Sequence, residues 1–293
     1  MNIGTFSFFE KTRTFIIAEL SANHNQDFEL AVKTIKAAKQ AGADAIKIQT
    51  YTADTITIDS DKEYFQINTG TLWDGTTLHK LYQQAYTPWE WQPELKHIAE
   101  NEGLIFFSSP FDITSVDFLE SMDVPAYKIA SFEINDIPLI SYVASKRKSV
   151  IISTGIATAE EIEEAVDTCR KAGNENIILL KCTSSYPAPV EEANLLTIPD
   201  LAKRFGVISG LSDHTMGGAV AVAAVALGAR VVEKHFILDR KIGGPDAAFS
   251  MEPAEFKQMV DDIRIVEKAI GKVEYNLTPQ TLKNKVLGRS RFD

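Results

Sequence analysis

Residues 207–236 read VISGLSDHTMGGAVAVAAVALGARVVEKHF, a stretch in which two apolar runs flank a segment of small residues. The first run, 207–212, is followed by Asp213 and His214, and the second run, 229–236, carries another histidine near its end. Two strands joined by a helix form a βαβ unit, in which the strands are parallel. The unit raises two questions: whether the chain repeats it, and why its strands end in polar residues.

The same alternation of a short apolar run and a longer segment with helical spacing recurs along the chain. Strands are predicted at 14–20, 45–50, 104–109, 126–131, 149–154, 177–182, 207–212 and 229–236. Between them, Asp27 is a candidate N-cap, Thr158 and Glu161 suit a capping box, and Pro253 suits a first helical turn. No antiparallel hairpin signal interrupts the middle of this series, so the sheet should be parallel.

Eight such units over roughly 250 residues are typical of a (β/α)8 barrel, also called a TIM barrel. The rival is an open doubly wound sheet, which usually carries a glycine-rich turn after its first strand. The turn here, ELSANHNQD at 19–27, has no glycine, so we predict a barrel over residues 1–280 with an N-terminal extension. The segment 51–87 is longer than the unit requires, and such long segments commonly form lids or binding loops.

The composition limits the possible functions. The chain has 293 residues, 45% of them hydrophobic, and no run of about 18 apolar residues that would predict a membrane-spanning helix. Its N-terminus lacks the charge order of a signal peptide, and Cys169 and Cys182 are too few for a disulfide framework. A cytoplasmic protein is therefore expected. The net charge of −10 argues against nucleic-acid binding but allows a basic pocket for a small anion.

Polar side chains gather at the predicted C-terminal ends of the strands, where the active sites of such barrels lie. They are Glu19, Lys47, Gln49, Ser109, Lys128, Ser131, Glu133, Ser184, Tyr186, Ser212, Asp213, His214, Glu233 and His235. His214 and His235 end neighbouring strands, so their imidazoles could share a divalent metal and leave positions for water and substrate. The alternative is that each histidine is a hydrogen-bonded structural residue.

Lys47 and Lys128 lie inside apolar strands, where a lysine is costly unless it is paired or functional. One interpretation is a clamp for the phosphate and carboxylate of an anion, completed by hydroxyls and loop amides. A second is Schiff-base chemistry on Lys128 or, as a weaker candidate, Lys181. The third is an ion pair with Glu19 or Glu133 in the barrel mouth. The serines at the strand ends favour the clamp.

Nine motifs follow one another in a distinctive order. They are IAELSANHN, GADAIKIQTY, FFSSPFD, PAYKIASFEIND, STGIAT, KCTSSYPAP, GLSDHT, EKHF and GGPDAAFS. From about residue 13 to its end, the chain resembles the catalytic barrel of the sialic acid synthase family. Within that family, IKIQTYT, ELSANH and FSMEPAEF are most similar to the branch that makes pseudaminic acid, and less similar to the N-acetylneuraminate branch.

The resemblance implies an enzyme that condenses phosphoenolpyruvate with an open-chain amino-sugar aldehyde, giving a nine-carbon 2-keto acid and phosphate. It implies a divalent cofactor, Mn²⁺ or Mg²⁺, held by His214 and His235, and catalytic carboxylates at Glu19 and Glu133. The residues implied for phosphoenolpyruvate binding are Lys47, Lys128, Ser109, Ser131, Ser184 and Ser212. Those implied near the sugar or the metal are Gln49, Tyr186 and Asp246, with Asp213 and Glu233 adjacent.

Members of the family usually carry a small antifreeze-like domain after the barrel, which covers the partner subunit's active site in a homodimer. The resemblance therefore implies that 281–293 begins a linker to such a domain, which this chain lacks, and that the protein is a homodimer. It also implies a place in bacterial surface-polysaccharide synthesis or flagellin glycosylation.

Two alternatives stay open. The same chemistry could yield N-acetylneuraminic or legionaminic acid, a choice that the acceptor pocket and the segment 51–87 would decide. The barrel could instead be a non-catalytic sugar-binding or assembly subunit, although two lysines, two histidines and two glutamates at one rim disfavour a scaffold.

Overall fold

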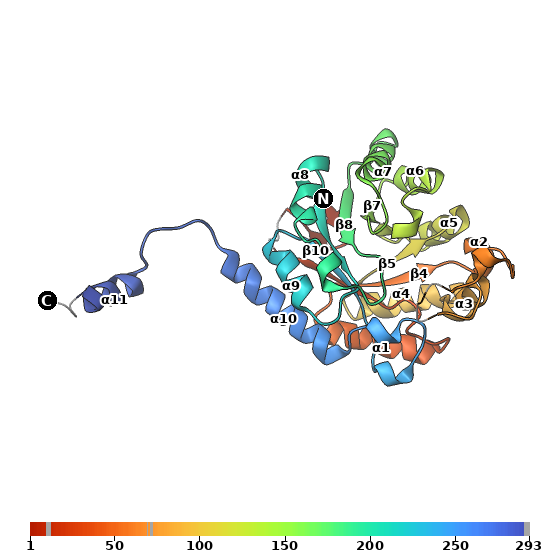
Figure 1. Cartoon of the computed structure of the whole chain (residues 1–293), viewed down its shortest axis with the longest axis horizontal. Helices are drawn as coiled ribbons and strands as arrows, with labels where there is room; N and C mark the ends of the chain where they lie inside the picture. The colour runs from red at the N-terminus through yellow and green to blue at the C-terminus, as the bar shows by residue number, and fades with distance from the viewer. Residues whose placement is uncertain (10–12, 69, 71–72, 290–293) are drawn as a thin grey trace.

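The computed structural model describes residues 1–9, 13–68, 70 and 73–289 of the chain. Within these residues, eight parallel strands close into a barrel in the order β10-β3-β4-β5-β6-β7-β8-β9, and helices surround it (Figure 1). The strands are β3 (Phe15–Glu19), β4 (Ala45–Thr50), β5 (Ile105–Pro110), β6 (Ala126–Ile129), β7 (Ser149–Ser153), β8 (Ile177–Cys182), β9 (Ile208–Asp213) and β10 (Val231–His235). The predicted TIM barrel is confirmed, and the open sheet is excluded because the strands close on themselves.

A helix follows each barrel strand on the outside of the barrel. These helices are α1 (Phe28–Gln40), α4 (Gln92–Asn101), α5 (Ile113–Ser121), α6 (Ile137–Ser145), α7 (Ala159–Lys171), α8 (Thr197–Phe205), α9 (Ala219–Ala226) and α10 (Pro253–Ile270). The predicted start signals are confirmed: Asp27 caps α1, Thr158 and Glu161 form the capping box of α7, and Pro253 opens α10. Capping thus fixes where these helices begin after their strands.

Alternate residues of each strand face opposite sides of the barrel wall. In β4, Ile46 and Ile48 pack outward among the helices, whereas Ala45 belongs to the apolar cluster inside the barrel. Lys47 and Gln49 follow Ala45 on the inner face because the period of a strand is two. The interior is therefore apolar near the N-terminal ends of the strands and polar near their C-terminal ends.

A short antiparallel hairpin packs against this inner apolar cluster. Its strands are β1 (Asn2–Ile3) and β2 (Phe6–Ser7). The rings of Phe6 and Phe8 lie 4.8 and 6.1 Å from the ring of Phe15, at the N-terminal end of β3. The predicted N-terminal extension is thus a plug, which leaves the opposite end of the barrel for ligands.

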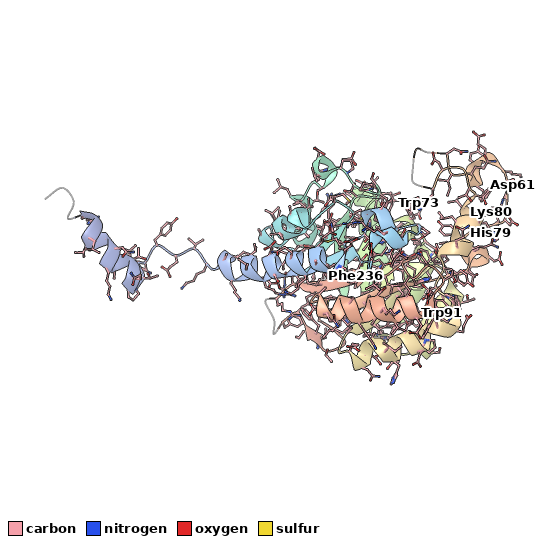
Figure 2. All side chains as sticks on the ribbon, turned by 90° about the horizontal axis from the view of Figure 1, so that it is seen from below. Asp61, Trp73, His79, Lys80, Trp91 and Phe236 are labelled. Atoms are coloured by element: carbon pink, nitrogen blue, oxygen red, sulfur yellow. The ribbon has the colours of Figure 1, made fainter. Side chains whose placement is uncertain are left out.

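The long segment 51–87 is more structured than the predicted loop. It contains α2 (Ala53–Ile56), the 3₁₀ turn η1 (Glu63–Phe65) and α3 (Leu78–Ala85), and its positions 69 and 71–72 lie outside the described residues. Figure 2 shows this segment at one side of the barrel, where Asp61, His79 and Lys80 are labelled. It follows β4, so it stands at the end of the barrel where the polar residues lie.

The segment predicted to begin a linker, 281–293, overlaps helix α11 (Pro279–Arg289), which stands away from the barrel (Figure 1). Positions 290–293 lie outside the described residues, and the linker stays a prediction. None of the described helices is long and apolar enough to cross a membrane. Cys169 and Cys182 are buried and both are free thiols.

Candidate active site at the barrel mouth

The parallel register places the polar strand ends at one level of the barrel. His235 of β10 is level with Glu19 of β3, and Glu19 is level with Lys47 of β4. Glu233 is level with Ser212 of β9. Because all the C-terminal ends meet at one rim, the inward-facing side chains of these strands converge above the apolar interior.

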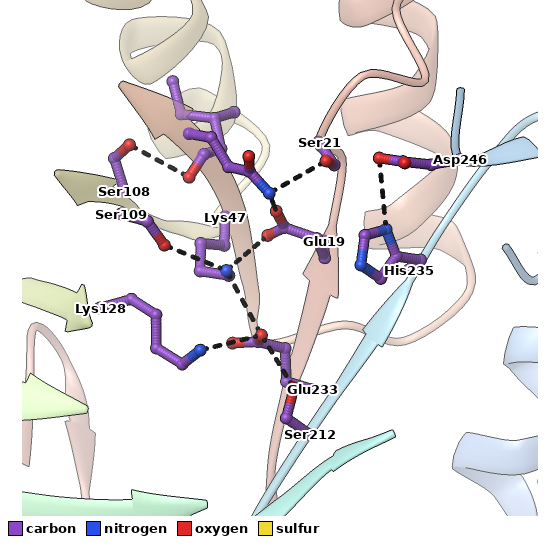
Figure 3. A network of polar contacts seen from close by, with 12 residues as sticks. Glu19, Ser21, Lys47, Ser108, Ser109, Lys128, Ser212, Glu233, His235 and Asp246 are labelled. Atoms are coloured by element: carbon purple, nitrogen blue, oxygen red, sulfur yellow. Dashed lines mark hydrogen bonds and ion pairs between the residues drawn. The ribbon is translucent and has the colours of Figure 1, made fainter. Parts of the chain in front are cut away.

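Two lysines and two glutamates form a buried charged layer across the barrel (Figure 3). The Lys47 ammonium lies 3.0 Å from Glu19 and 3.3 Å from Glu233, and the Lys128 ammonium lies 3.3 Å from the same Glu233 oxygen. None of these four side chains is more than 6% exposed. The ion pair predicted between Lys47 and Glu19 is present, and Glu233, rather than Glu133, joins the two lysines.

The protonation equilibria of this layer reflect a balance of burial and charge. Burial raises the pKa of Glu19 above its ordinary value, against the attraction of Lys47. Burial also acts to raise the pKa of Glu233, but Lys128 and Lys47 outweigh it and lower that pKa to about 2. For Lys128, burial lowers the pKa and Glu233 only partly offsets it. Lys128 is therefore a buried cation with incomplete compensation, which favours the entry of an anion.

A cradle of small side chains surrounds Gly155, just after β7. A Cβ atom at this position would clash with Ser184 Oγ and would lie 2.8 Å from Ser131 Oγ and 3.2 Å from Cys182 Sγ, so no larger residue fits here. The Gly155 amide donates to Ser131 Oγ at 3.1 Å. Ser184 Oγ is buried and has no hydrogen-bond partner among the described residues. Such a hydroxyl can bind an incoming phosphate.

The other two predicted serines belong to the charged layer. Lys47 Nζ donates to Ser109 Oγ at 3.3 Å, and Ser212 Oγ donates to Glu233 at 3.3 Å. The residues predicted to bind phosphoenolpyruvate therefore come from the neighbouring ends of β4, β5, β6, β8 and β9.

The two histidines lie side by side, with ring centroids 5.4 Å apart. His214 Nδ1 lies 2.9 Å from the Thr183 carbonyl, so Nδ1 donates there and Nε2 is left for other partners. Burial lowers the pKa of His235 well below its ordinary value and keeps its imidazole neutral. Burial also acts to lower the pKa of His214, but Cys182 and Thr183 outweigh it and raise that pKa.

These donors fit a divalent cation. His235 Nδ1 is buried without a hydrogen-bond partner in the described residues, and Asp246 Oδ2 lies 3.8 Å away, too far for a hydrogen bond. Two imidazoles beside a carboxylate are a donor set that suits divalent metals. No group of three or more His, Cys, Asp or Glu side chains in the described segments is arranged to hold a metal ion, so water and substrate would have to supply the remaining ligands.

A cavity of about 580 Å³ opens onto this mouth, a volume typical of small-ligand sites. Gln49 lines it and connects it to the charged layer, because the Gln49 amide donates to Glu19 and to Ser21 at 3.0 Å each. Tyr186 lines it as well, with its ring 4.4 Å from that of His214. The remaining predicted residues on its wall are Glu133, Ser184, His235 and Asp246.

Glu133 is the acidic group of the cavity that lacks a tight partner. It ends the 3₁₀ turn η3 (Ser131–Glu133) that follows β6, and its Oε2 is buried without a hydrogen-bond partner in the described chain. Burial raises the pKa of Glu133 to about 7. The side chain can therefore hold or release a proton near neutral pH.

Two residues considered from the sequence face away from the mouth. Asp213 accepts from Lys234 Nζ at 2.6 Å and from the Thr215 amide at 2.9 Å, on the outer face of the barrel wall. The Asp213 side chain therefore faces away from the cavity, because the alternation that turns His214 inward turns Asp213 outward, and its role near the sugar or metal stays a prediction. Lys181 donates to the Cys182 carbonyl at 2.7 Å, on the face opposite to the inward Cys182 side chain.

Three residues of the mouth were not predicted from the sequence: Gly155, Ser153 and Cys182. Ser153 Oγ is buried without a partner in the described residues. Cys182 Sγ lies 3.8 Å from His214 Nδ1; burial acts to raise the Cys182 pKa, but His214 outweighs it and lowers it to about 7. Strand alternation could have found Ser153 and Cys182, because each ends a strand on its inner face.

A barrel plugged at one end, with a cavity and a layer of buried charges at the other, places the protein among the TIM-barrel enzymes that act at their C-terminal rim. Comparison with known proteins specifies the family. A model described as the NeuB family matches residues 34–275. The chain therefore belongs to the NeuB family, and it is an enzyme.

Similar proteins agree with this assignment. The chain is 50% identical over 292 residues to pseudaminic acid synthase from Campylobacter jejuni, covering 100% of this chain and 84% of that protein. It is 48% identical over 278 residues to pseudaminic acid synthase from Helicobacter pylori, covering 94% and 82%. The solved N-acetylneuraminic acid (sialic acid) synthetase of Leptospira borgpetersenii, in complex with citrate, has a TM-score of 0.81 at 32% identity, covering 96% and 92%.

Proposed function

We propose that the chain is a pseudaminic acid synthase. It condenses phosphoenolpyruvate with the open-chain aldehyde of 2,4-diacetamido-2,4,6-trideoxy-β-L-altropyranose, and it releases pseudaminic acid and phosphate. The observation that carries this proposal is the incompletely compensated Lys128, buried with Lys47 at the mouth of a cavity of about 580 Å³. The 50% identity to a synthase named for pseudaminic acid supports the choice of product.

Phosphoenolpyruvate binds in the charged layer and its serine cradle. Its negative groups meet the ammonium groups of Lys47 and Lys128, and an anion in this position restores the pKa of Lys128 that burial has lowered. Ser131 and Ser184 offer hydroxyls beside Gly155, where the absence of a side chain lets both oxygens approach the backbone closely. Holding the anion beside the acceptor lowers the entropic cost of the bimolecular step.

His214 and His235, with Asp246 beside them, are the residues that would hold Mn²⁺ or Mg²⁺. Metal binding requires the neutral imidazole of His214, whose pKa is raised by Cys182 against the effect of burial. When bound, such an ion supplies Lewis acidity toward the aldehyde oxygen of the acceptor. The neutral imidazole of His235, whose Nδ1 is buried without a hydrogen-bond partner among the described residues, supports this assignment.

Glu19 and Glu133 act at the two reacting carbons. C3 of phosphoenolpyruvate attacks the aldehyde carbon, and positive character develops at C2. Glu19, held by Gln49 and Lys47, stabilises that charge and positions the water that adds to C2. Protonated Glu133 supplies the proton that turns the aldehyde oxygen into a hydroxyl. Loss of phosphate from the tetrahedral C2 then leaves the 2-keto acid.

Phosphate release by the purified chain with phosphoenolpyruvate and Mn²⁺ tests the proposal. We expect release with 2,4-diacetamido-2,4,6-trideoxy-L-altrose and none with N-acetylmannosamine. Glu19→Gln should lower the rate about a hundred- to ten-thousandfold, because it removes the charge beside C2. Glu163→Gln, on the exposed face of α7, is the matched control and should keep the wild-type rate.

The other outcomes separate the alternatives. Release with N-acetylmannosamine alone would replace the proposed product with N-acetylneuraminic acid. No release with either acceptor, from a folded chain that still binds phosphoenolpyruvate, would favour the non-catalytic barrel. A normal rate for Glu19→Gln would remove the role proposed for that carboxylate.

A further inference from the structure

The cavity at the mouth has one wall of mixed polar and apolar side chains and one wall that is apolar throughout. The wall built from the barrel and its other loops includes the polar side chains of Ser21, Gln49, Glu133, Ser184, His235 and Asp246. The wall built from the segment 51–87 consists of Tyr51, Ile56, Ile67, Trp73, Leu78, Leu81, Tyr82 and Ala85. Each of these eight residues is aliphatic or aromatic, so the segment presents an apolar surface to whatever enters. We call these eight residues the apolar wall.

Helix α3 shows how the sequence builds this wall. Leu78, Leu81, Tyr82 and Ala85 follow the spacing i, i+3, i+4, i+7, which places them on one face of the helix. That face lines the cavity. None of the four belongs to either apolar core cluster of the described residues, and all of them are only half-buried. An amphipathic helix normally turns this stripe toward the core, whereas here it is turned toward a ligand space.

The apolar wall is fixed to the barrel rather than loosely apposed to it. The Trp73 indole donates to the Pro245 carbonyl at 2.9 Å, and its ring lies 5.6 Å from that of Tyr186. The Tyr82 ring lies 5.5 Å from that of Tyr51, at the end of β4. Such a surface can discriminate between ligands because its side chains are held in place before binding.

The orientation of the acceptor follows from the chemistry at the barrel wall. Its aldehyde end must meet Glu19 and the imidazole of His235, which belong to the polar side of the mouth. The opposite end of the sugar and its N-acyl methyl groups are therefore left to the apolar wall. A methyl group buried there is favourable, whereas a hydroxyl buried there without a partner carries a desolvation cost.

We propose that the apolar wall makes the enzyme selective for acceptor sugars whose unreactive end is a 6-deoxy methyl group, over sugars that end in a hydroxymethyl group. This inference rests on the proposed function and adds the part of the acceptor that is recognised and the residues that recognise it. Ile56 and Leu81 are the positions chosen to test this selectivity, because both are aliphatic residues of the wall and neither packs in the cores described above.

The experiment compares two acceptors that differ only at C6: 2,4-diacetamido-2,4,6-trideoxy-L-altrose and its 6-hydroxy analogue. We expect the wild type to favour the 6-deoxy sugar in kcat/KM by tens of times to about a hundredfold, as a hydrophobic pocket discriminates against an added hydroxyl. Ile56→Asn and Leu81→Asn, which keep the number of side-chain heavy atoms but make the side chain polar, should narrow this preference about tenfold. The KM for phosphoenolpyruvate should stay unchanged, because the charged layer is untouched.

Ile58→Asn is the matched control, because Ile58 lies two positions from Ile56, is 61% exposed and does not line the cavity. It should keep the wild-type preference. Leu81→Ala serves if Leu81→Asn does not fold, and it should lower kcat/KM for the 6-deoxy sugar more than for the 6-hydroxy sugar.

Two results would overturn the inference while the proposed function stands: equal use of both sugars by the wild type, or wall variants that slow both sugars equally. Absence of phosphate release with either sugar is a different failure. It would remove the proposed function, and the inference with it.

Discussion

Strand β10 carries buried charges on both of its faces, and the two faces are built differently. On the outer face, Lys234 Nζ donates to Asp213 and to the Thr215 carbonyl at 2.6 Å each, and Asp213 accepts two further bonds from Thr215. On the inner face, Glu233 is shared between two lysines at 3.3 Å. Its Oε2 is buried without a hydrogen-bond partner in the described residues. The charged groups of the outer face have close hydrogen-bond partners, whereas one carboxylate oxygen of the inner face has none among the described residues.

The difference separates a structural ion pair from a ligand site. A buried ion pair stabilises a fold only when short geometry and further hydrogen bonds offset the loss of hydration. The outer pair meets this condition, and it ties β9 to β10 beside His214 and His235, so it is a positioning contact for both imidazoles. The inner layer falls short of that condition, and its incomplete compensation is what an anionic substrate can supply.

Breaking the outer pair should have the largest effect on stability. Lys234→Met leaves the Asp213 carboxylate buried without a cation, and we expect the free energy of unfolding to fall by about 3–5 kcal/mol. Urea unfolding measures this. Adding Asp213→Asn should recover part of the loss, because the uncompensated charge is then removed. The fraction of Lys234→Met that stays folded should still bind phosphoenolpyruvate, since the inner layer is intact.

The exposed pair of Lys257 and Asp261 provides the control for this prediction. Their side chains are 57% and 52% exposed, so Lys257→Met should change the free energy of unfolding by less than about 1 kcal/mol. If Lys234→Met were no more destabilising than Lys257→Met, the outer pair would not be the structural contact described above.

Removing a lysine of the inner layer should have little effect on stability and a large effect on catalysis. In Lys128→Met, Glu233 keeps Lys47, and the cost of burying the Lys128 ammonium disappears, so we expect the free energy of unfolding to change by less than about 2 kcal/mol. The kcat/KM for phosphoenolpyruvate should fall about a hundred- to a thousandfold, because the substrate loses a buried charge partner. Steady-state kinetics and urea unfolding of the same preparation measure both.

Lys36→Met, on the exposed side of α1, controls for the loss of one positive charge from the chain. It should change neither the free energy of unfolding nor the kcat/KM for phosphoenolpyruvate. A Lys128→Met enzyme that unfolds as easily as Lys234→Met but keeps its kinetics would show that the assignment of the two faces is inverted.

Much of this contrast was accessible from the sequence. Alternation along VVEKHF predicts Glu233 and His235 on one face, and the structure confirms it. The same alternation, counted from the inward-facing His214, places the Asp213 side chain on the outer face. The sequence prediction instead grouped Asp213 with His214, because the two residues are adjacent in the chain. The pairing of Lys128 with Glu233 could not be predicted, because the two residues are 105 positions apart and meet only when the barrel closes.

Other features could not be predicted, because a sequence pattern does not show what the apolar face of a helix or strand packs against. The stripe of Leu78, Leu81, Tyr82 and Ala85 shows that one side of α3 is apolar, but it does not distinguish a core from a cavity. The strands β1 and β2 have two residues each, too few to show alternation. The eight barrel strands were predictable because each is a run of four or more residues with a buried face.

Glu133 offers a smaller test, because it is an inward carboxyl without the two lysine partners of Glu233. Burial raises its pKa from about 4.5 to about 7, and Lys128 and Lys47 only partly oppose this. Below the lower value the carboxyl is protonated in both the folded and the unfolded chain. Between the two values the folded chain keeps the proton that the unfolded chain has released, so stability falls as the pH rises through this window. Above pH 7 the folded chain carries the full cost of burying the ionised Glu133 carboxylate.

A shift of one pKa unit corresponds to about 1.4 kcal/mol. With an allowance for partial solvent contact, the free energy of unfolding should therefore fall by about 1–3 kcal/mol between pH 4.5 and 7. Glu133→Gln removes the titrating group, so its unfolding free energy should decline less over this window and exceed that of the wild type at pH 8. Urea unfolding at several pH values measures the two slopes. Glu163→Gln should keep the wild-type slope, because that carboxylate is exposed on α7. Equal slopes for Glu133→Gln and the wild type would mean that Glu133 is compensated like Glu233, and it could not then act as the proton donor near neutral pH.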